Sequence, residues 1–329
     1  MKKITALIVS VCFIATMAYG QSEKESFKPS GKVFMRVFTN FHSSFSDGTS
    51  ASAFELDRAY LGYDFNLSET FSGKINIDIG NPGNGSAFEM TAYIKNAYIN
   101  YTKEKFTVSF GMIPTTQFEL QEKMWGNRYV EKSFQDAYKI GSSADLGIRA
   151  GYSFTNWLSA DVIVVNGEGY KKLQADKYFK SGVGLTLIPV KNLTARAYYD
   201  FIGKDETQTT FTALLGYDFG KASLYGEYNI QNNVGYKADK TLSGTSVYAS
   251  VIPLKNVKVY GRYDYLTSNT LSGETSNWNL AKDGNLIVAG VEFQPVKGFK
   301  ISPNYRLWTP SNSGSKPVNY FYISCDIKF

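Results

Sequence analysis

The chain ends on the ten residues Tyr320-Phe321-Tyr322-Ile323-Ser324-Cys325-Asp326-Ile327-Lys328-Phe329, in which apolar and polar side chains alternate without a break. Successive side chains of a β-strand point to opposite faces, so this stretch predicts a strand with one apolar and one polar face. The apolar face would carry Phe321, Ile323, Cys325, Ile327 and Phe329. A chain that ends inside a strand leaves backbone groups that must be paired. The fold must therefore supply a neighbour for its own carboxy-terminal strand.

The amino-terminus has the three parts of a secretory signal peptide. A basic start, Met1-Lys2-Lys3, precedes an apolar stretch over residues 4–17 and the small-residue segment Ala18-Tyr19-Gly20. A membrane anchor is the alternative, but about 14 apolar residues are too few to span a bilayer. We therefore expect cleavage after residue 20, export of the protein, and a short periplasmic segment, residues 21–31, before the first strand.

Charge and cysteine content exclude several classes of protein. Without Lys2 and Lys3, the chain has 33 basic and 29 acidic residues, a net charge of +4, which argues against nucleic-acid binding. The mature chain keeps only Cys325, so no intramolecular disulfide is expected, and a lipoprotein anchor at Cys12 is disfavoured because Val11 precedes it. The 24 Tyr and 23 Phe favour β-structure and membrane interfaces.

A recurring sequence pattern marks tight turns between alternating strands: a Gly or Ser, three or four strand residues, a tight turn, and then another alternating strand. Its last five occurrences begin 32 to 40 residues apart, which fits two strands of about ten residues with one short and one long connection. The pattern covers residues 62–65, 151–157, 184–193, 216–221, 250–257 and 290–299. The intervening connections are long and polar, at residues 80–86, 166–177, 232–244, 268–284 and 310–317. Short connections at one rim and long ones at the other are typical of outer-membrane barrels.

These turns divide residues 32–329 into about sixteen expected strands. They lie at residues 32–41, 54–66, 71–79, 93–102, 105–113, 144–154, 157–166, 179–188, 192–202, 208–219, 221–231, 244–253, 257–267, 284–295, 299–308 and 319–329. We expect an all-β fold, a transmembrane antiparallel β-barrel with both termini in the periplasm, in which the last strand pairs with the first. A soluble propeller or an extended adhesin is the alternative, because its strands would show the same local alternation.

The strand phases place six of the seven arginines inside the barrel. Sixteen strands enclose a water-filled lumen, so function is expected on the inward faces. The expected pore-lining residues are Arg36, Arg58, Lys74, Arg149, Arg196, Arg262 and Arg306, with Arg128 in a loop. Four of these arginines fall on strands near the closure and would line one wall, which suits a fixed positive field. Equally, arginines could face inward only because charge avoids lipid, paired with acids such as Asp78 or Asp264.

The longest connection, residues 114–143, is too apolar for a solvated surface loop. Its aromatic residues need cover, and the inside of the barrel offers it. We therefore expect a constriction loop that folds inward and brings its carboxylates opposite the arginine wall; an external lid is the alternative. The residues expected to form the constriction are Phe118, Glu119, Glu122, Trp125, Arg128 and Glu131.

Four segments resemble a known family, the phosphate-selective porins O and P and their porin relatives in Bacteroidetes. They cover residues 54–65, 73–80, 94–101 and 108–114, and begin with Phe54-Glu55-Leu56-Asp57-Arg58-Ala59-Tyr60-Leu61-Gly62-Tyr63. The resemblance implies a homotrimeric sixteen-stranded channel. The terminal Phe329 is also similar to the insertion signal of outer-membrane barrels, which implies the barrel assembly machinery as a partner. This chain lacks the lysine ladder of the phosphate-selective members.

The predicted function is a bacterial outer-membrane porin that gives passive diffusion to small polar or anionic solutes with weak anion preference, surrounded by outer-membrane lipid. A channel selective for phosphate or oligophosphate is the alternative. A barrel enzyme is less favoured, because the single histidine, His42, has no motif that would partner it. A gated importer would need a plug domain before the first strand. No cofactor, metal or nucleic acid is expected.

Overall fold

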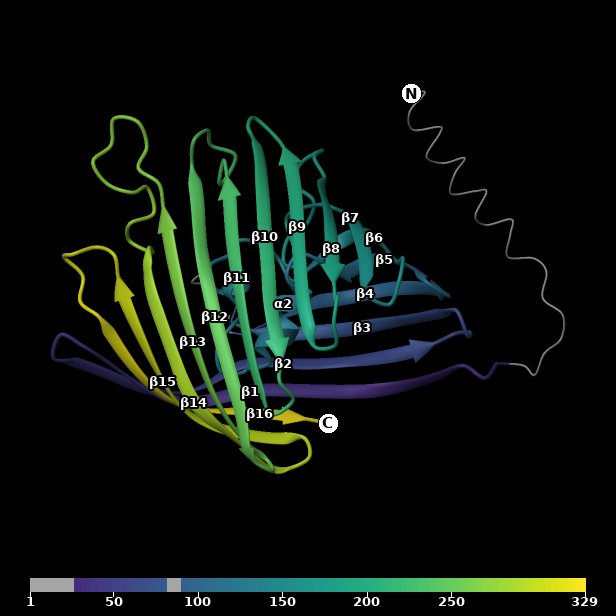
Figure 1. Ribbon diagram of the computed structural model, residues 1–329, viewed down its shortest axis with the longest axis horizontal. Coiled ribbons are helices and arrows are strands. Elements are labelled where there is room, and N and C mark those ends of the chain that lie inside the picture. Colours follow the sequence, from purple (N-terminus) through teal and green to yellow (C-terminus); the bar gives the residue numbers. More distant parts are fainter. Residues whose placement is uncertain (1–26, 82–89) are drawn as a thin grey trace.

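The computed structural model describes residues 27–81 and 90–329. The expected signal peptide, residues 1–20, and most of the segment 21–31 lie outside the described residues and stay predictions. Within the described part, sixteen antiparallel strands form one closed barrel (Figure 1). No helix among these residues is long and apolar enough to cross a membrane.

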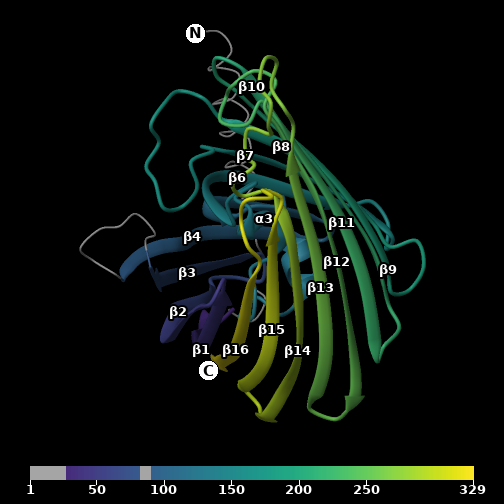
Figure 2. The ribbon, with the colours of Figure 1, turned by 90° about the vertical axis from the view of Figure 1, so that its left-hand side faces the viewer.

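The strands follow one another around the barrel in chain order, and β16 lies beside β1 (Figures 1 and 2). Their bounds are β1 (Ser30–Ser46), β2 (Thr49–Asn66), β3 (Phe71–Gly80), β4 (Thr91–Lys103), β5 (Phe106–Pro114), β6 (Ala144–Ser153), β7 (Leu158–Val165), β8 (Lys180–Leu187), β9 (Leu193–Gly203), β10 (Thr207–Asp218), β11 (Ala222–Asn232), β12 (Thr241–Leu254), β13 (Val257–Ser268), β14 (Gly284–Val296), β15 (Phe299–Pro310) and β16 (Val318–Lys328). The predicted strand number and the predicted closure are confirmed.

The carboxy-terminal strand has the two faces that its alternation predicts. Phe321 and Ile323 are 55% and 46% exposed on the outside, whereas Ser324 and Asp326 are buried inside. The ladder between β16 and β1 runs from Arg36 opposite Lys328 to Phe45 opposite Asn319. Beyond it, the N–H of Phe329 donates to the carbonyl of Met35 over 3.0 Å, so the last residue is paired as well.

The first hairpin is longer than predicted. We expected its strands to stop at residue 41 and restart at residue 54, but β1 and β2 continue to a two-residue turn at Asp47-Gly48. Both turn residues have positive φ, 48° and 77°, as a tight hairpin with right-handed strand twist requires. The added residues are rich in serine and lie beyond the apolar band. Because a β-ladder is formed by backbone groups, it can continue through such residues.

Two β-bulges interrupt the ladders on one side of the barrel. Between β1 and β2 the register skips Asp57, and between β3 and β4 it skips Lys95. A bulge inserts one extra residue, so two consecutive side chains can face the same way. Asp57 and Arg58 both reach partners inside the barrel, and Lys95 and Asn96 both line an interior cavity. The bulges therefore place two additional charged residues in the lumen.

We predict that a proline at Ser324 prevents closure of the barrel, whereas an alanine at the same position does not. Ser324 lies in both flanking ladders, opposite Asn40 and Ser302. Proline removes one ladder hydrogen bond, which costs at least about 1–3 kcal/mol in a buried sheet. After refolding in detergent, Ser324→Ala should migrate on an unheated gel as the compact form, and Ser324→Pro should not. A compact Ser324→Pro variant would contradict the role given to this ladder.

Candidate functional site

The connection between β5 and β6 lies inside the barrel. It contains two short helices, α2 (Glu119–Trp125) and α3 (Phe134–Ala137), and α2 lies within the ring of strands (Figure 1). Phe118, Trp125 and Tyr129 are only 1%, 5% and 2% exposed. The Trp125 ring lies edge-on to Tyr248 and Tyr260 of the barrel wall, with ring centres 5.7 and 5.9 Å away. The loop thus folds inward, as its apolar residues predict, and is not an external lid.

Four arginines of the wall hold this loop by its backbone carbonyls. Each donates to one loop carbonyl and also pairs with a carboxylate. The carbonyl partners are Pro114 for Arg149 at 3.3 Å, Thr116 for Arg196 at 2.7 Å, Lys132 for Arg262 at 2.5 Å, and Val130 for Arg306. The planar guanidinium carries five donors in a fixed fork, so one side chain can serve both partners.

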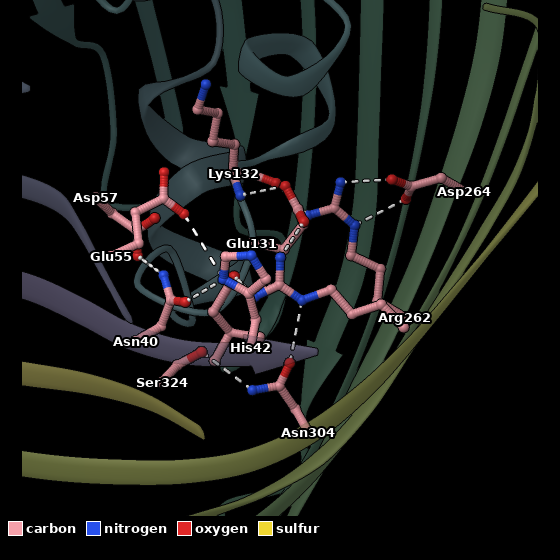
Figure 3. Close-up of polar contacts among 12 residues, drawn as sticks. Asn40, His42, Glu55, Asp57, Glu131, Lys132, Arg262, Asp264, Asn304 and Ser324 are labelled. Carbon is pink, nitrogen blue, oxygen red and sulfur yellow. Dashed lines mark hydrogen bonds and ion pairs between the residues drawn. The ribbon is translucent and has the colours of Figure 1, made fainter. Parts of the chain in front are cut away.

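Figure 3 shows the anchor at the loop segment 130–132. Arg262 donates to both oxygens of Asp264, at 2.8 and 2.6 Å, and to the backbone of Lys132. Glu131 accepts from Arg306 at 2.8 Å, and the same guanidinium donates to Asn304 at 3.1 Å. Two strands, β13 and β15, therefore fix one end of the constriction loop.

The remaining basic residues expected to line the pore are also paired. Arg36 binds Asp326 through two hydrogen bonds of 2.8 Å, and Arg58 binds Asp78, which also accepts from the Tyr170 hydroxyl at 2.5 Å. Lys74 lies 3.1 Å from Asp64. The arginines face inward, but the structure gives each of them an acidic neighbour.

The loop carboxylates do not all pair with the arginine wall near the closure. Glu131 pairs with Arg306 of that wall, but Glu119 pairs with Arg149 of β6 at 2.8 Å, and Glu122 pairs with Arg128 of the loop itself at 3.0 Å. Glu119 and Glu122 nevertheless line the same cavity as Arg36 of that wall. The apolar side of α2, with Trp125, packs against β12 and β13.

Arg128 and Asp136 form the internal tie of the loop. Their charged groups lie 2.8 Å apart, and Arg128 also pairs with Glu122. Burial opposes ionisation of Asp136, but the charge of Arg128, followed by that of Lys132, outweighs it and lowers the pKa of Asp136 below its ordinary value of 3.8. The carboxylate thus stays charged at all ordinary pH values.

A second connection, residues 166–179, also turns inward. The sequence indicates only a long polar connection there. Tyr170 reaches the Asp78 carboxylate and lies edge-on to Tyr93, with ring centres 6.3 Å apart. Gly167 and Gly169 before it have positive φ values, 105° and 80°. This Gly-Glu-Gly-Tyr segment was the available signal, since it combines two flexible positions with one large aromatic residue.

A cavity of about 370 Å³ remains between the constriction loop and the wall of β1 and β4. Four basic and two acidic side chains line it, together with polar and apolar groups. The charged ones are Arg36, Lys95, Lys123, Arg128, Glu119 and Glu122. The lining of this cavity therefore carries more basic than acidic side chains, although its two arginines, Arg36 and Arg128, are paired with carboxylates.

The described residues hold no group of three His, Cys, Asp or Glu side chains that could bind a metal. His42 lies 2.9 Å from the Asn40 amide oxygen and stacks on Tyr322, with ring centres 5.1 Å apart. Glu55 lies 3.9 Å from the same ring. His42 is thus held by a hydrogen bond to Asn40 and by stacking on Tyr322.

No family model matches the chain, and no curated protein matches it. Solved structures do. The outer-membrane channel DcaP of Acinetobacter baumannii has a TM-score of 0.66 at 11% identity, over 94% of this chain and 99% of that one. OmpF of Salmonella typhi, in complex with daunomycin, has a TM-score of 0.68 at 13% sequence identity, over 91% of this chain and 97% of that one. The anion-selective porin of Comamonas acidovorans has a TM-score of 0.62 at 13% sequence identity, over 92% of this chain and 100% of that one. The chain thus shares the barrel fold of outer-membrane porins.

We predict that Arg306→Gln loosens the constriction loop. The substitution removes the ion pair with Glu131 and the hydrogen bond to Val130, and a hydrogen bond to a charged group contributes about 1.5–3 kcal/mol. Single-channel recordings should show more current noise and a larger mean current than the wild type. Lys103→Gln, at an exposed lysine on β4, serves as control and should leave the noise unchanged. Equal current noise in Arg306→Gln and Lys103→Gln would contradict the anchoring role of Arg306.

We also predict that the Asp136–Arg128 pair stabilises the protein down to acidic pH. Because the folded pKa of Asp136 lies below 3.8, its contribution is complete above that pH and is lost only as the pH falls through the lowered pKa. Denaturant unfolding of wild type and Asp136→Asn should differ by about 1–3 kcal/mol from pH 8 to pH 5. The difference should shrink only below about pH 4. A difference that disappears near pH 6 would contradict the assignment.

Proposed function

We propose that the protein is a bacterial outer-membrane channel through which small hydrophilic solutes diffuse passively, with weak preference for anions. The observation that carries this proposal is the net positive cavity between the constriction loop and the wall. A barrel of sixteen strands is too wide for its wall side chains to fill. The loop narrows the lumen, and what remains is polar.

The pairing of the arginines explains why the preference should be weak. Each arginine has a carboxylate partner, so the summed field of the lumen is small. Among the residues that line the cavity, Lys95 and Lys123 form no ion pair in the described part of the chain. The alternative, a phosphate-selective channel, would need several guanidinium or ammonium groups free to bind the same oxyanion.

The placement in the membrane belongs to the same proposal. The rim that carries both termini has seven connections of two to five residues. At the opposite rim six of the eight connections are longer, and the other two, β1–β2 and β9–β10, have two and three residues. Because barrels of this class keep short turns in the periplasm, we place both termini there. Phe329, 76% exposed at the end of β16, would serve as the insertion signal for the barrel assembly machinery, and the inserted protein would form a homotrimer.

The experiment is conductance in a planar bilayer. Purified protein should give stable stepwise currents in KCl, and under a salt gradient the reversal potential should indicate modest chloride preference. Lys123→Glu, which reverses one charge of the cavity lining, should shift the reversal potential toward potassium. Replacing chloride by phosphate separates a general pore from a phosphate-selective one.

Two outcomes would contradict the proposal. Folded protein that gives no current would exclude a channel. A cation-selective reversal potential for the wild type would exclude the role given to the positive cavity lining.

A further inference from the structure

Lys95 is a half-buried lysine of the barrel wall that forms no ion pair with a carboxylate of the described residues. The bulge in β4 turns it into the lumen, where it lines the cavity beside the constriction loop. Among residues 27–81 and 90–329, Lys95 forms no ion pair within 4.0 Å; it lies over the ring faces of Tyr60 and Tyr170, at 5.0 and 5.9 Å, and its charge helps to lower the pKa of Asp136. An aromatic face stabilises a cation but leaves its N–H donors free for an anion.

Two further donors beside Lys95 are buried and unsatisfied. Asn96, from the same bulge, lines the cavity, is only 6% exposed, and its amide nitrogen has no partner in the described part of the chain. The Tyr60 hydroxyl is likewise unpartnered there, with Tyr60 only 8% exposed. Buried donors are ordinarily satisfied, so unpartnered ones next to a cavity indicate a place for an acceptor.

A second lysine approaches from the inward-turned connection. Lys171 lies 4.8 Å from the ring centre of Tyr93 and 6.0 Å from that of Tyr170, and it forms no ion pair among the described residues. Burial, and after it the charge of Arg58, lowers the pKa of Lys171. Two ammonium groups thus lie near the Tyr170 ring, whose hydroxyl donates to the Asp78 carboxylate.

From these donors we propose that Lys95, Asn96 and Tyr60, with Lys171 near the Tyr170 ring, form a binding subsite for small organic carboxylates in the passage. The Lys95 ammonium, the Asn96 amide nitrogen and the Tyr60 hydroxyl can each donate to a carboxylate, which accepts through two oxygens. The tyrosine rings supply an apolar surface for the carbon skeleton of the solute. Inorganic phosphate is less well matched, because the guanidinium forks that recognise it are occupied by Asp78, Glu122 and Asp136.

This inference rests on the proposed channel function, since the subsite would select among solutes that pass. A channel that binds a solute weakly in its passage favours that solute's entry while still releasing it. The subsite would thus give the pore a substrate class beyond a general preference for negative charge.

The test is calorimetric titration of the detergent-solubilised protein with benzoate, with inorganic phosphate as the second ligand. Wild type should show saturable binding of benzoate. Lys95→Gln should weaken it at least about tenfold, and Tyr60→Phe, which keeps the ring and removes the hydroxyl, by about threefold to tenfold. Lys103→Gln, which removes one exposed lysine of the same strand, should bind as the wild type does.

Three results would overturn the proposed subsite. Absent benzoate binding, or Lys95→Gln that is folded by gel migration and binds normally, would exclude it. Phosphate that binds as tightly as benzoate would exclude the organic class. KCl conductance of the same preparations keeps the two proposals apart: current without benzoate binding refutes only the subsite, and benzoate binding without current refutes only the channel.

Discussion

The pairing of β1 with β16 is the constraint on which the rest of the structure depends. An open sheet of this length would expose two rows of unpaired N–H and C=O groups, which a membrane core does not tolerate. The closing ladder continues to the last residue, where Phe329 and Met35 exchange both backbone hydrogen bonds. Closure with sixteen strands also sets the width of the lumen, and with it the space that the loop between β5 and β6 occupies.

The loop lies in the lumen because wall and loop are complementary in two ways. Its aromatic residues cover apolar wall residues, with Trp125 against Tyr248 and Tyr260. Its carbonyls and carboxylates meet four wall arginines, and the guanidinium fork lets each arginine serve both kinds of acceptor. Inward-facing arginines in this barrel therefore hold the loop, and Lys95 and Lys123, which form no ion pair among the described residues, contribute most to the charge of the cavity lining.

The sequence predicted what depends on alternation and failed where the outcome depends on pairing. Alternation along β9 and β16 correctly assigns their inner and outer faces, since the position of a residue in a strand determines the face on which its side chain lies. The inward loop was predictable from its uncovered aromatic residues. The bulges at Asp57 and Lys95 were not, because a bulge is a property of two strands in register. Nor could spacing show that Glu119 meets Arg149, or that Tyr170 returns to Asp78.

The most direct test of the central claim is the size dependence of solute entry into liposomes that contain the folded protein. A closed barrel narrowed by a held loop should admit a neutral monosaccharide, admit a disaccharide more slowly, and exclude a tetrasaccharide, as read from the rate of osmotic swelling. Equal rates for all sizes would contradict a held constriction. The absence of swelling with every solute, in liposomes shown to contain heat-modifiable protein, would contradict a water-filled passage altogether.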